Sequence, residues 1–252
     1  MSVTILNPSP PLQWNGSLTT RSSTNRVIFH HAAVNTASVH DIHNSHLNLG
    51  WEGIGYNFYI RKNGDIYAGR GWNKVGAHAS GYNSTSVGIC CEGYYHHDYN
   101  GYTQEPPRIQ IKSLIELIIE AKKRYTITSL GGHNDFNNTD CPGNLFPKSA
   151  VIHAVAVYSQ VVTACAKLAM KGIINTQEYW IGYFWCLQYL DDLLINCSNQ
   201  CKNYITGNYT TVASAIQRLA NAQIINSPNY WLNNYSSVQY LGDFLKSAAN
   251  HA

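Results

Sequence analysis

The chain has 252 residues, enough for one large or two modest domains. Charged residues make up only 12% of it, against a usual share of about 25%, and the polar character comes instead from Asn, Ser, Thr and 18 Tyr. The formal net charge is +3 without a run of Lys or Arg. Sequence-independent nucleic-acid binding needs a concentrated basic patch and is therefore excluded. No run of about 18 apolar residues occurs, so we expect no transmembrane helix and no membrane partner.

The N-terminus and the cysteines bear on where the protein is made. The first eleven residues have neither a basic start nor an apolar stretch, which predicts that no signal peptide is present. The seven Cys are odd in number and two of them are adjacent, so no regular disulfide framework is visible. We therefore expect reduced, mostly buried thiols in a protein made in a cytosol.

In the first part of the chain, predicted strands alternate with predicted helices. The strands are short apolar runs, and the helices show apolar residues three and four positions apart. In chain order we expect an extended arm (1–25), a strand (26–31), a helix (40–48), a hairpin (56–60 and 65–68), a strand (86–92) and a helix (109–125). This order indicates an α/β domain over residues 1–150, with a mixed central sheet flanked by helices.

After Pro147 the sequence becomes helical and repeats itself with a period of 51 residues. Residues 167–199 and 218–250, aligned without gaps, are identical at 13 of 33 positions, against roughly 6% expected by chance. Paired copies would bury apolar faces that one copy alone leaves open. We therefore expect a smaller all-α domain over 155–252, made of two related repeats. Each has three helices: one ending near Gly172 in the first copy, one after Thr176 or Ser227, and one over about 187–199 or 238–250.

Two His and one Cys, distant along the chain, are the side chains most typical of a metal site. His30 ends the first predicted strand, and His133 and Cys141 lie in the segment 131–143. Two imidazoles and a thiolate suit Zn²⁺, and three protein ligands leave the open position of a catalytic site. Because zinc activates water and polarises carbonyls, the predicted chemistry is hydrolysis of an amide or ester. Successive strand residues face opposite ways, so His31 cannot share the site with His30.

Five segments carry a resemblance to a known family. In order along the chain they are Val27-Ile28-Phe29-His30-His31, Gly53-Ile54-Gly55-Tyr56-Asn57-Phe58, Val75-Gly76-Ala77-His78-Ala79-Ser80-Gly81-Tyr82-Asn83, Ser86-Val87-Gly88-Ile89 and Thr139-Asp140-Cys141-Pro142-Gly143. Over roughly residues 20–150 the chain resembles the zinc-dependent N-acetylmuramoyl-L-alanine amidases of the peptidoglycan-recognition-protein and phage-lysozyme type (amidase type 2).

The resemblance implies a peptidoglycan hydrolase. Zinc-activated water would cleave the amide between N-acetylmuramic acid and L-alanine of the stem peptide. The family's metal ligands fall on His30, His133 and Cys141, and its catalytic tyrosine falls on Tyr56. Further matched positions are Thr139, which would assist at the tetrahedral intermediate, and His78 and Asn83, which would border the stem-peptide groove.

Glu92 is a candidate general base. Some relatives place a general-base Glu on this strand, but at the position of Cys90. Cys90 and Glu92 share one strand face, so the Glu92 carboxylate could approach the zinc water. A solvated strand end is an equally good interpretation of Glu92.

Several alternatives stay open. A non-catalytic peptidoglycan-binding protein is the rival function, although the chain keeps Cys141, which some binding-only relatives replace. The helical domain is expected to bind bacterial peptidoglycan or a secondary cell-wall polymer, or else to mediate self-association. An enzyme without an export signal resembles phage endolysins, which leave the cell through a separate holin pore.

Other histidines and aromatic pairs have simpler interpretations. His40, His43 and His46 are expected to form a polar helix face, and His96-His97 an exposed loop pair. The repeated pairs Tyr179-Trp180 and Tyr230-Trp231 favour core packing, with a duplicated sugar-stacking site as the alternative.

Overall fold

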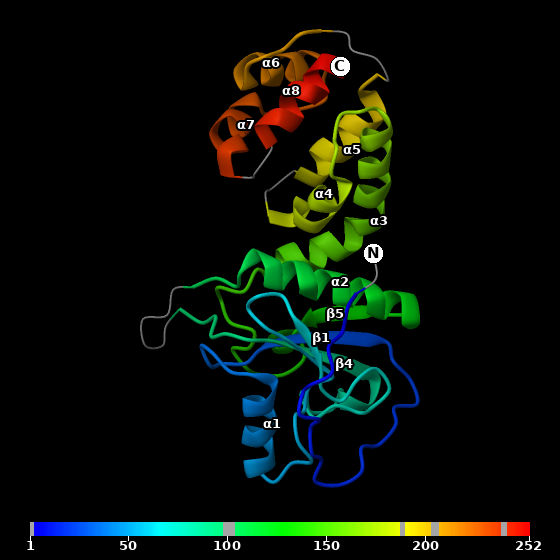
Figure 1. Ribbon diagram of the computed structural model, residues 1–252, viewed down its shortest axis with the longest axis vertical. Coiled ribbons are helices and arrows are strands. Elements are labelled where there is room, and N and C mark those ends of the chain that lie inside the picture. The colour runs from blue at the N-terminus through cyan, green and yellow to red at the C-terminus, as the bar shows by residue number, and fades with distance from the viewer. Residues whose placement is uncertain (1–2, 98–103, 187–189, 203–206, 238–240) are drawn as a thin grey trace. The chain divides into compact units, whose positions relative to one another are not determined.

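A computed structural model describes residues 3–97, 104–186, 190–202, 207–237 and 241–252 (Figure 1). The chain divides into two compact units, which are called here the N-terminal unit, Met1–Val155, and the C-terminal unit, Ala156–Ala252.

The N-terminal unit is built on a five-stranded mixed sheet in the order β3-β2-β4-β1-β5. β1, β4 and β5 run parallel, as do β2 and β4, whereas β2 and β3 form the expected antiparallel hairpin. The sheet confirms the expected α/β class, and β5 is a strand that the sequence did not indicate. The strands are β1 (Arg26–His31), β2 (Phe58–Ile60), β3 (Ile66–Ala68), β4 (Ser86–Cys91) and β5 (Ser129–Gly132).

Helices cover both faces of the sheet (Figure 1). α1 (Val39–Asn48) begins at a capping box, in which the Ser38 hydroxyl and the Asp41 carboxylate each accept from the other's backbone N–H. Val39 and Ile42 of this helix pack in one apolar cluster with Tyr59 and Cys90 of the sheet. α2 (Arg108–Arg124) contacts β2 and β4 from the opposite face.

The strand register decides which face each histidine takes. His30 pairs with Cys90, and Tyr59 pairs with Cys90 from the other side, so His30 lies on the α1 face of the sheet. The next residue, His31, is directed away, and its Nδ1 accepts a 3.1 Å hydrogen bond from the Tyr95 backbone N–H. Of the two histidines only His30 joins the donor group with His133 and Cys141, as expected, although His31 lines a pocket beside that group.

The described part of the C-terminal unit contains helices and no strands. α3 (Lys148–Met170) crosses the boundary between the units, and it is followed by α4 (Gln177–Tyr183), α5 (Leu190–Gln200), α6 (Val212–Asn221), α7 (Pro228–Asn234) and α8 (Leu241–His251). α4 and α7 begin and end 51 residues apart, as do α5 and α8. The expected starts of the third helices, at 187 and 238, lie outside the described residues.

The two copies share local geometry as well as helix positions. Gly172 and Gln223, which are 51 residues apart, both adopt a positive φ, +70° and +58° respectively. A left-handed conformation is unfavourable for a residue with a side chain, so the turn is imposed by the packing of the copy. Thr176 and Ser227 stand at the N-caps of α4 and α7, as expected, but neither side chain caps its helix.

The cysteines agree with the sequence expectation, whereas the helix α3 does not. All seven cysteines are free and five are buried, as expected. The expectation that no helix could span a membrane is wrong in one respect. α3 is long enough and apolar enough to do so, judged by length and composition alone, and 33% of its apolar stretch is buried. Ala and Val raise its average apolar character although Ser, Thr and Gln interrupt the run. Core helices of globular proteins meet the same criterion.

Candidate active site

His30, His133 and Cys141 come together at one edge of the sheet. Their ligand atoms all lie within 4.8 Å of one another. The Cys141 Sγ lies 3.7 Å from Nδ1 of His30, and the centroids of the two imidazole rings are 4.5 Å apart. Nitrogen and sulfur ligands of a tetrahedral Zn²⁺ are about 3.6 Å apart, from bond lengths of about 2.0 and 2.3 Å. The donor set and its spacing therefore fit zinc.

Adjacent strands deliver two of these side chains, and a short loop delivers the third. His30 lies near the carboxyl end of β1, and His133 directly follows its neighbour β5. A 2.8 Å hydrogen bond from Asn134 N–H to the Cys141 carbonyl fastens the loop beside β5. A Cβ on Gly132 would lie 2.7 Å from Pro142 Cδ, so glycine permits this close approach.

The protonation states of the three side chains suit a divalent cation. Burial, followed by the charges of the neighbouring His78 and His133, lowers the pKa of His30 well below its usual value. Burial also lowers the pKa of His133 and raises the pKa of the Cys141 thiol to about 12. Both imidazoles are therefore neutral donors, and formation of the thiolate requires a cation close to the sulfur.

A chain of hydrogen bonds behind His30 determines which of its nitrogens faces the cluster. Ser86 donates its hydroxyl proton to the Tyr82 carbonyl at 2.8 Å, so its oxygen must accept from His78 Nε2, 3.2 Å away. His78 Nδ1 then carries no proton and accepts from His30 Nε2 at 3.0 Å. This network assigns the lone pair of His30 to Nδ1, the nitrogen beside Cys141.

His78 and Asn83 therefore support the site from behind His30, and their expected place beside a substrate groove stays a prediction. His78 is only 8% exposed, and burial lowers its pKa to about 3. Asn83 Oδ1 accepts from the backbone N–H groups of His78 and Ala79 at 2.8 and 2.9 Å. Both side chains thus hold the loop that carries His78 behind His30.

The Gly88 position explains one glycine of the family-like segments. A Cβ built on Gly88 would lie 2.3 Å from Cδ2 of His78, which no real contact tolerates. The imidazole of His78 thus packs directly on the backbone of β4. Glycine is required here because the imidazole of His78, which hydrogen-bonds to His30, needs the space, and not because the backbone turns.

Tyr56 and Thr139 line a pocket of about 340 Å³ together with Cys141. The ring centroid of Tyr56 lies 5.2 Å from that of His30. Burial, with the charges of Cys90 and Cys141, raises the pKa of the Tyr56 phenol well above its usual value, so it stays a hydrogen-bond donor. Thr139 Oγ1 accepts from Cys141 N–H at 3.3 Å, and its hydroxyl has no acceptor among the described residues. The structure thus brings both predicted residues to the cluster.

Glu92 is not brought to the cluster, and both interpretations from sequence are wrong. Its carboxylate is 2% exposed and accepts from Arg61 Nε at 2.6 Å and from the backbone N–H groups of Ala37 and Lys62 at 3.0 and 2.9 Å. Burial alone would raise the pKa of Glu92, but these donors outweigh it and lower the pKa. Glu92 is a buried ion-pair partner that fastens the end of β4.

The structure also places histidines that the sequence misjudged. His96 is half-buried and lines the pocket beside Tyr94, and only His97 is exposed as expected. No motif marked His96; its one signal is its place in the loop after β4. Of the α1 histidines, His43 is buried and is bonded to the Gln13 carbonyl at 2.9 Å and to Ile54 N–H at 3.1 Å. It is a structural residue, and none of the three belongs to the metal cluster among the described residues.

Comparisons with known proteins agree with this geometry. The sequence model described as N-acetylmuramoyl-L-alanine amidase matches residues 20–144. Peptidoglycan-recognition protein SC2 of Drosophila melanogaster is 36% identical over 160 residues, which cover 57% of this chain and 82% of that protein. An endolysin of Klebsiella phage KP32 is 36% identical over 127 residues, covering 49% of this chain and 83% of its own.

A solved structure is similar as well. The N-acetylmuramoyl-L-alanine amidase LysC from Clostridium intestinale URNW has 37% sequence identity and a TM-score of 0.53, covering 58% of this chain and 93% of that one. The sheet, the donor cluster and these matches together show that the chain belongs to the N-acetylmuramoyl-L-alanine amidase family (amidase type 2).

Proposed function

We propose that this protein is an active, zinc-dependent amidase that cuts the bond between N-acetylmuramic acid and L-alanine in bacterial peptidoglycan. The observation that carries the proposal is the cluster of His30, His133 and Cys141, with all ligand atoms within 4.8 Å, beside a pocket lined by Tyr56 and Thr139. A binding-only protein has no need for a complete donor set of this kind.

His30, His133 and Cys141 would hold the zinc ion and leave room beside it for water and substrate. When bound there, zinc supplies a Lewis acid that polarises an amide carbonyl and lowers the pKa of water. The protein's part is to present neutral imidazole nitrogens, and the supporting chain through His78 keeps Nδ1 of His30 unprotonated and correctly aimed.

Tyr56 and Thr139 supply donors for the negative charge that develops on the carbonyl oxygen. The phenol of Tyr56 keeps its proton because burial raises its pKa. A donor already in place stabilises the oxyanion without any reorganisation during the reaction. The hydroxyl of Thr139 is a weaker donor than a cationic side chain, so we assign it the smaller share.

The test is the release of free amino ends from purified cell walls, followed by mass spectrometry of the products. A cut at the proposed bond leaves L-alanine as the new amino end. Chelation of zinc, or Cys141→Ser, should abolish release, whereas Cys186→Ser, a half-buried thiol of the C-terminal unit, should not. Full activity of Cys141→Ser would refute the zinc assignment.

The second candidate function is peptidoglycan binding without catalysis. It is favoured by the 36% identity with a peptidoglycan-recognition protein. The same assay separates the two, because a recognition protein is retained on walls and releases no amino ends. We propose further that the C-terminal unit binds the wall. Self-association is its rival, and sedimentation of the full chain distinguishes them.

We also propose that the enzyme reaches the wall through a separate membrane pore. The similarity to a phage endolysin supports this route. Lysis that depends on co-expression of a pore-forming protein would agree with it.

A further inference from the structure

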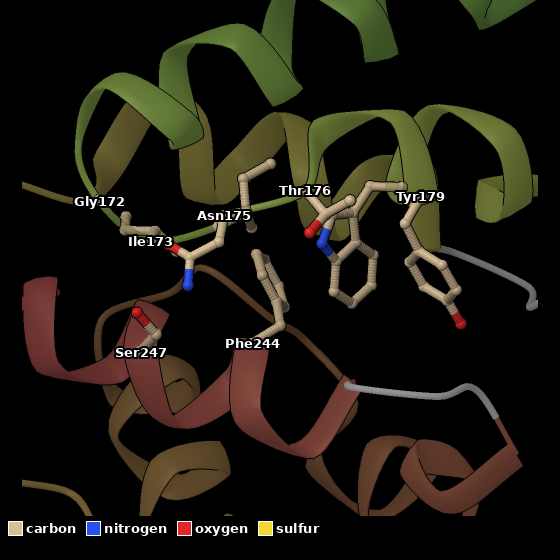
Figure 2. Close-up of a pocket in the computed structure, with 9 residues that line it drawn as sticks. Gly172, Ile173, Asn175, Thr176, Tyr179, Phe244 and Ser247 are labelled. Carbon is tan, nitrogen blue, oxygen red and sulfur yellow. The ribbon is translucent and has the colours of Figure 1, made fainter.

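Two pockets of equal size lie in the C-terminal unit, each about 340 Å³ in volume. The first pocket is lined by the segment 172–176, Tyr179 and Trp180 of the first copy, and by Phe244 and Ser247 of α8 in the second copy. Figure 2 shows Asn175 and Ser247 on opposite sides of this pocket, with Phe244 extending from α8 toward the first copy.

The second pocket is the counterpart of the first under the 51-residue repeat. It is lined by the segment 224–227 and Trp231 of the second copy, and by Asp192, Leu193 and Asn196 of α5 in the first copy. Each pocket thus takes its loop from one copy and its opposite wall from the third helix of the other copy. Such a reciprocal exchange is the mark of an approximate two-fold arrangement of the copies.

The repeated aromatic pairs have nearly the same geometry in the two copies, although only Trp231 of the second pair lines its pocket. The ring centroids of Tyr179 and Trp180 are 5.4 Å apart at 87°, and those of Tyr230 and Trp231 are 5.3 Å apart at 89°. The backbone N–H of each tyrosine donates to the carbonyl of the residue three positions earlier, at 3.1 and 3.0 Å. The local geometry of the aromatic pair is therefore the same in the two copies, although most of the aligned positions of the repeat differ.

Burial explains some of the identical positions but not the asparagines. Leu168 and Leu219, for instance, are fully buried equivalents in the helical core. Asn175 and Asn226 are identical yet exposed, and their amides make no hydrogen bond within the described ranges. Core packing gives no reason for an exposed amide in both copies, whereas a ligand that the amide contacts would give one.

The lining chemistry favours an uncharged, hydroxyl-rich ligand. Every lining residue of the first pocket is uncharged, and the exposed Asn175 and Thr176 add an amide and a hydroxyl to its lining. Trp180 and Trp231 are only 5% and 4% exposed, so they pack in the core, as expected, and form an apolar floor. An apolar floor with a few convergent polar groups and a volume near the lower limit of ligand pockets suits one small saccharide.

We propose that each of the two pockets binds one uncharged saccharide unit of the cell-wall polymer. This inference rests on the proposed wall-binding role of the C-terminal unit and specifies its ligand class and its two sites. Sugar hydroxyls bond to the Asn and Thr or Ser side chains, and the apolar sugar face lies on the Ile and Trp floor. In the second pocket the Asp192 carboxylate adds an acceptor for hydroxyls.

Two equivalent sites on one chain produce avidity on a repetitive polymer. Once the first pocket has bound, the second meets the same chain of sugars at a high effective concentration. Loss of either pocket therefore removes the avidity as well as one site, and loss of both removes retention.

The test uses the full chain carrying Cys141→Ser, so that the walls are not digested. Asn175→Ala and Asn226→Ala each alter one pocket, and Ser247→Trp fills the first pocket from the opposite copy. Asn233→Ala, an exposed asparagine of α7 outside both pockets, is the matched control. We expect each single pocket variant to lower wall affinity about tenfold or more, the double variant at least about 100-fold, and the control not at all.

The probes separate the two possible sources of the saccharide. They are a soluble N-acetylglucosamine tetramer, untreated walls, and walls stripped of secondary polymers with hydrofluoric acid. Binding to the tetramer and to stripped walls identifies the glycan strand, and retention on untreated walls alone identifies a secondary polymer. Calorimetry with a binding probe should give two sites in the wild type and one in each single variant.

Several outcomes would overturn the proposal. The first is that the variant carrying both Asn175→Ala and Asn226→Ala is retained on walls as well as the protein without them. The second is that the protein is retained on stripped walls but does not bind the tetramer. The third is that the protein is not retained on any wall. The amidase function is measured separately, with Cys141 intact, on a soluble muropeptide that the pockets do not need. Pocket variants should turn it over at the wild-type rate, so failure of the amidase and failure of the pockets are distinguishable.

Discussion

His78→Leu should weaken zinc binding although His78 is not itself a ligand. The substitution removes the nitrogen that accepts from His30 Nε2 at 3.0 Å and breaks the chain to Ser86. Without this acceptor, His30 loses the interaction that keeps its proton on Nε2 and its lone pair on Nδ1. Loss of such an outer partner typically costs 10- to 100-fold in metal affinity, or about 1.4 to 2.7 kcal/mol.

The assay is competition for zinc between the purified protein and a chromophoric chelator, which needs no substrate and no turnover. His78→Asn, whose amide oxygen can occupy the place of Nδ1, should recover part of the affinity. The matched control is His43→Leu, which removes another buried histidine with two hydrogen bonds, at 2.9 and 3.1 Å, outside the cluster. It should lower the melting temperature and leave zinc affinity unchanged.

A folded His78→Leu variant that binds zinc as tightly as the wild type would refute the reasoning. Folding is checked by the melting transition, because the imidazole also fills space against Gly88. An equal loss of zinc affinity in His43→Leu would show that general destabilisation, and not the supporting chain, causes the effect.

Gly88→Ala places a Cβ 2.3 Å from the His78 ring, so it should lower zinc affinity as His78→Leu does; an unchanged chelator titration would contradict the proposed packing. Tyr56→Phe should lower turnover of walls about 100-fold through loss of an oxyanion donor while zinc affinity stays the same; equal turnover would exclude Tyr56 from the reaction. Glu92→Gln should cost about 1–3 kcal/mol of unfolding free energy at neutral pH, because the donors of Arg61, Lys62 and Ala37 lose their charged acceptor. Since the pKa of Glu92 is lowered in the folded state, its contribution is present above the unfolded-state pKa of about 4.3 and is lost as the pH falls through the folded value. Urea unfolding across pH should show that loss in the wild type only, and a stable but inactive Glu92→Gln would instead revive the general-base assignment.

Local sequence patterns were sufficient for most elements of the N-terminal unit. The short apolar run in residues 26–31 predicts β1, the apolar spacing in 109–125 predicts α2, and the Lys62-Asn63-Gly64 turn predicts the hairpin, each within a few residues. β5 was missed because Ser129–Gly132 contains one apolar residue besides glycines. β5 is the edge strand of the sheet, and its backbone pairing with β1 holds it in place although it has no apolar run of its own.

The metal ligands could be named from sequence because their residue types and their local motifs are specific to the chemistry. The residues behind them could not, because a supporting role depends on distance in space. Glu92 shares a strand face with Cys90, yet Arg61 and two backbone N–H groups hold its carboxylate. His78 shares a motif with Asn83, yet it is buried against His30.

By itself the sequence determined the family, the three zinc-type donors and the 51-residue repeat, since these depend on residue identity and spacing along the chain. Tertiary structure alone decided that His78 orients His30, that Glu92 is an ion-pair partner, and that each repeat completes the pocket of the other. The physical reason is that these contacts join residues far apart in the chain, 31 positions for Arg61 and Glu92 and 48 for His30 and His78, which no local pattern records.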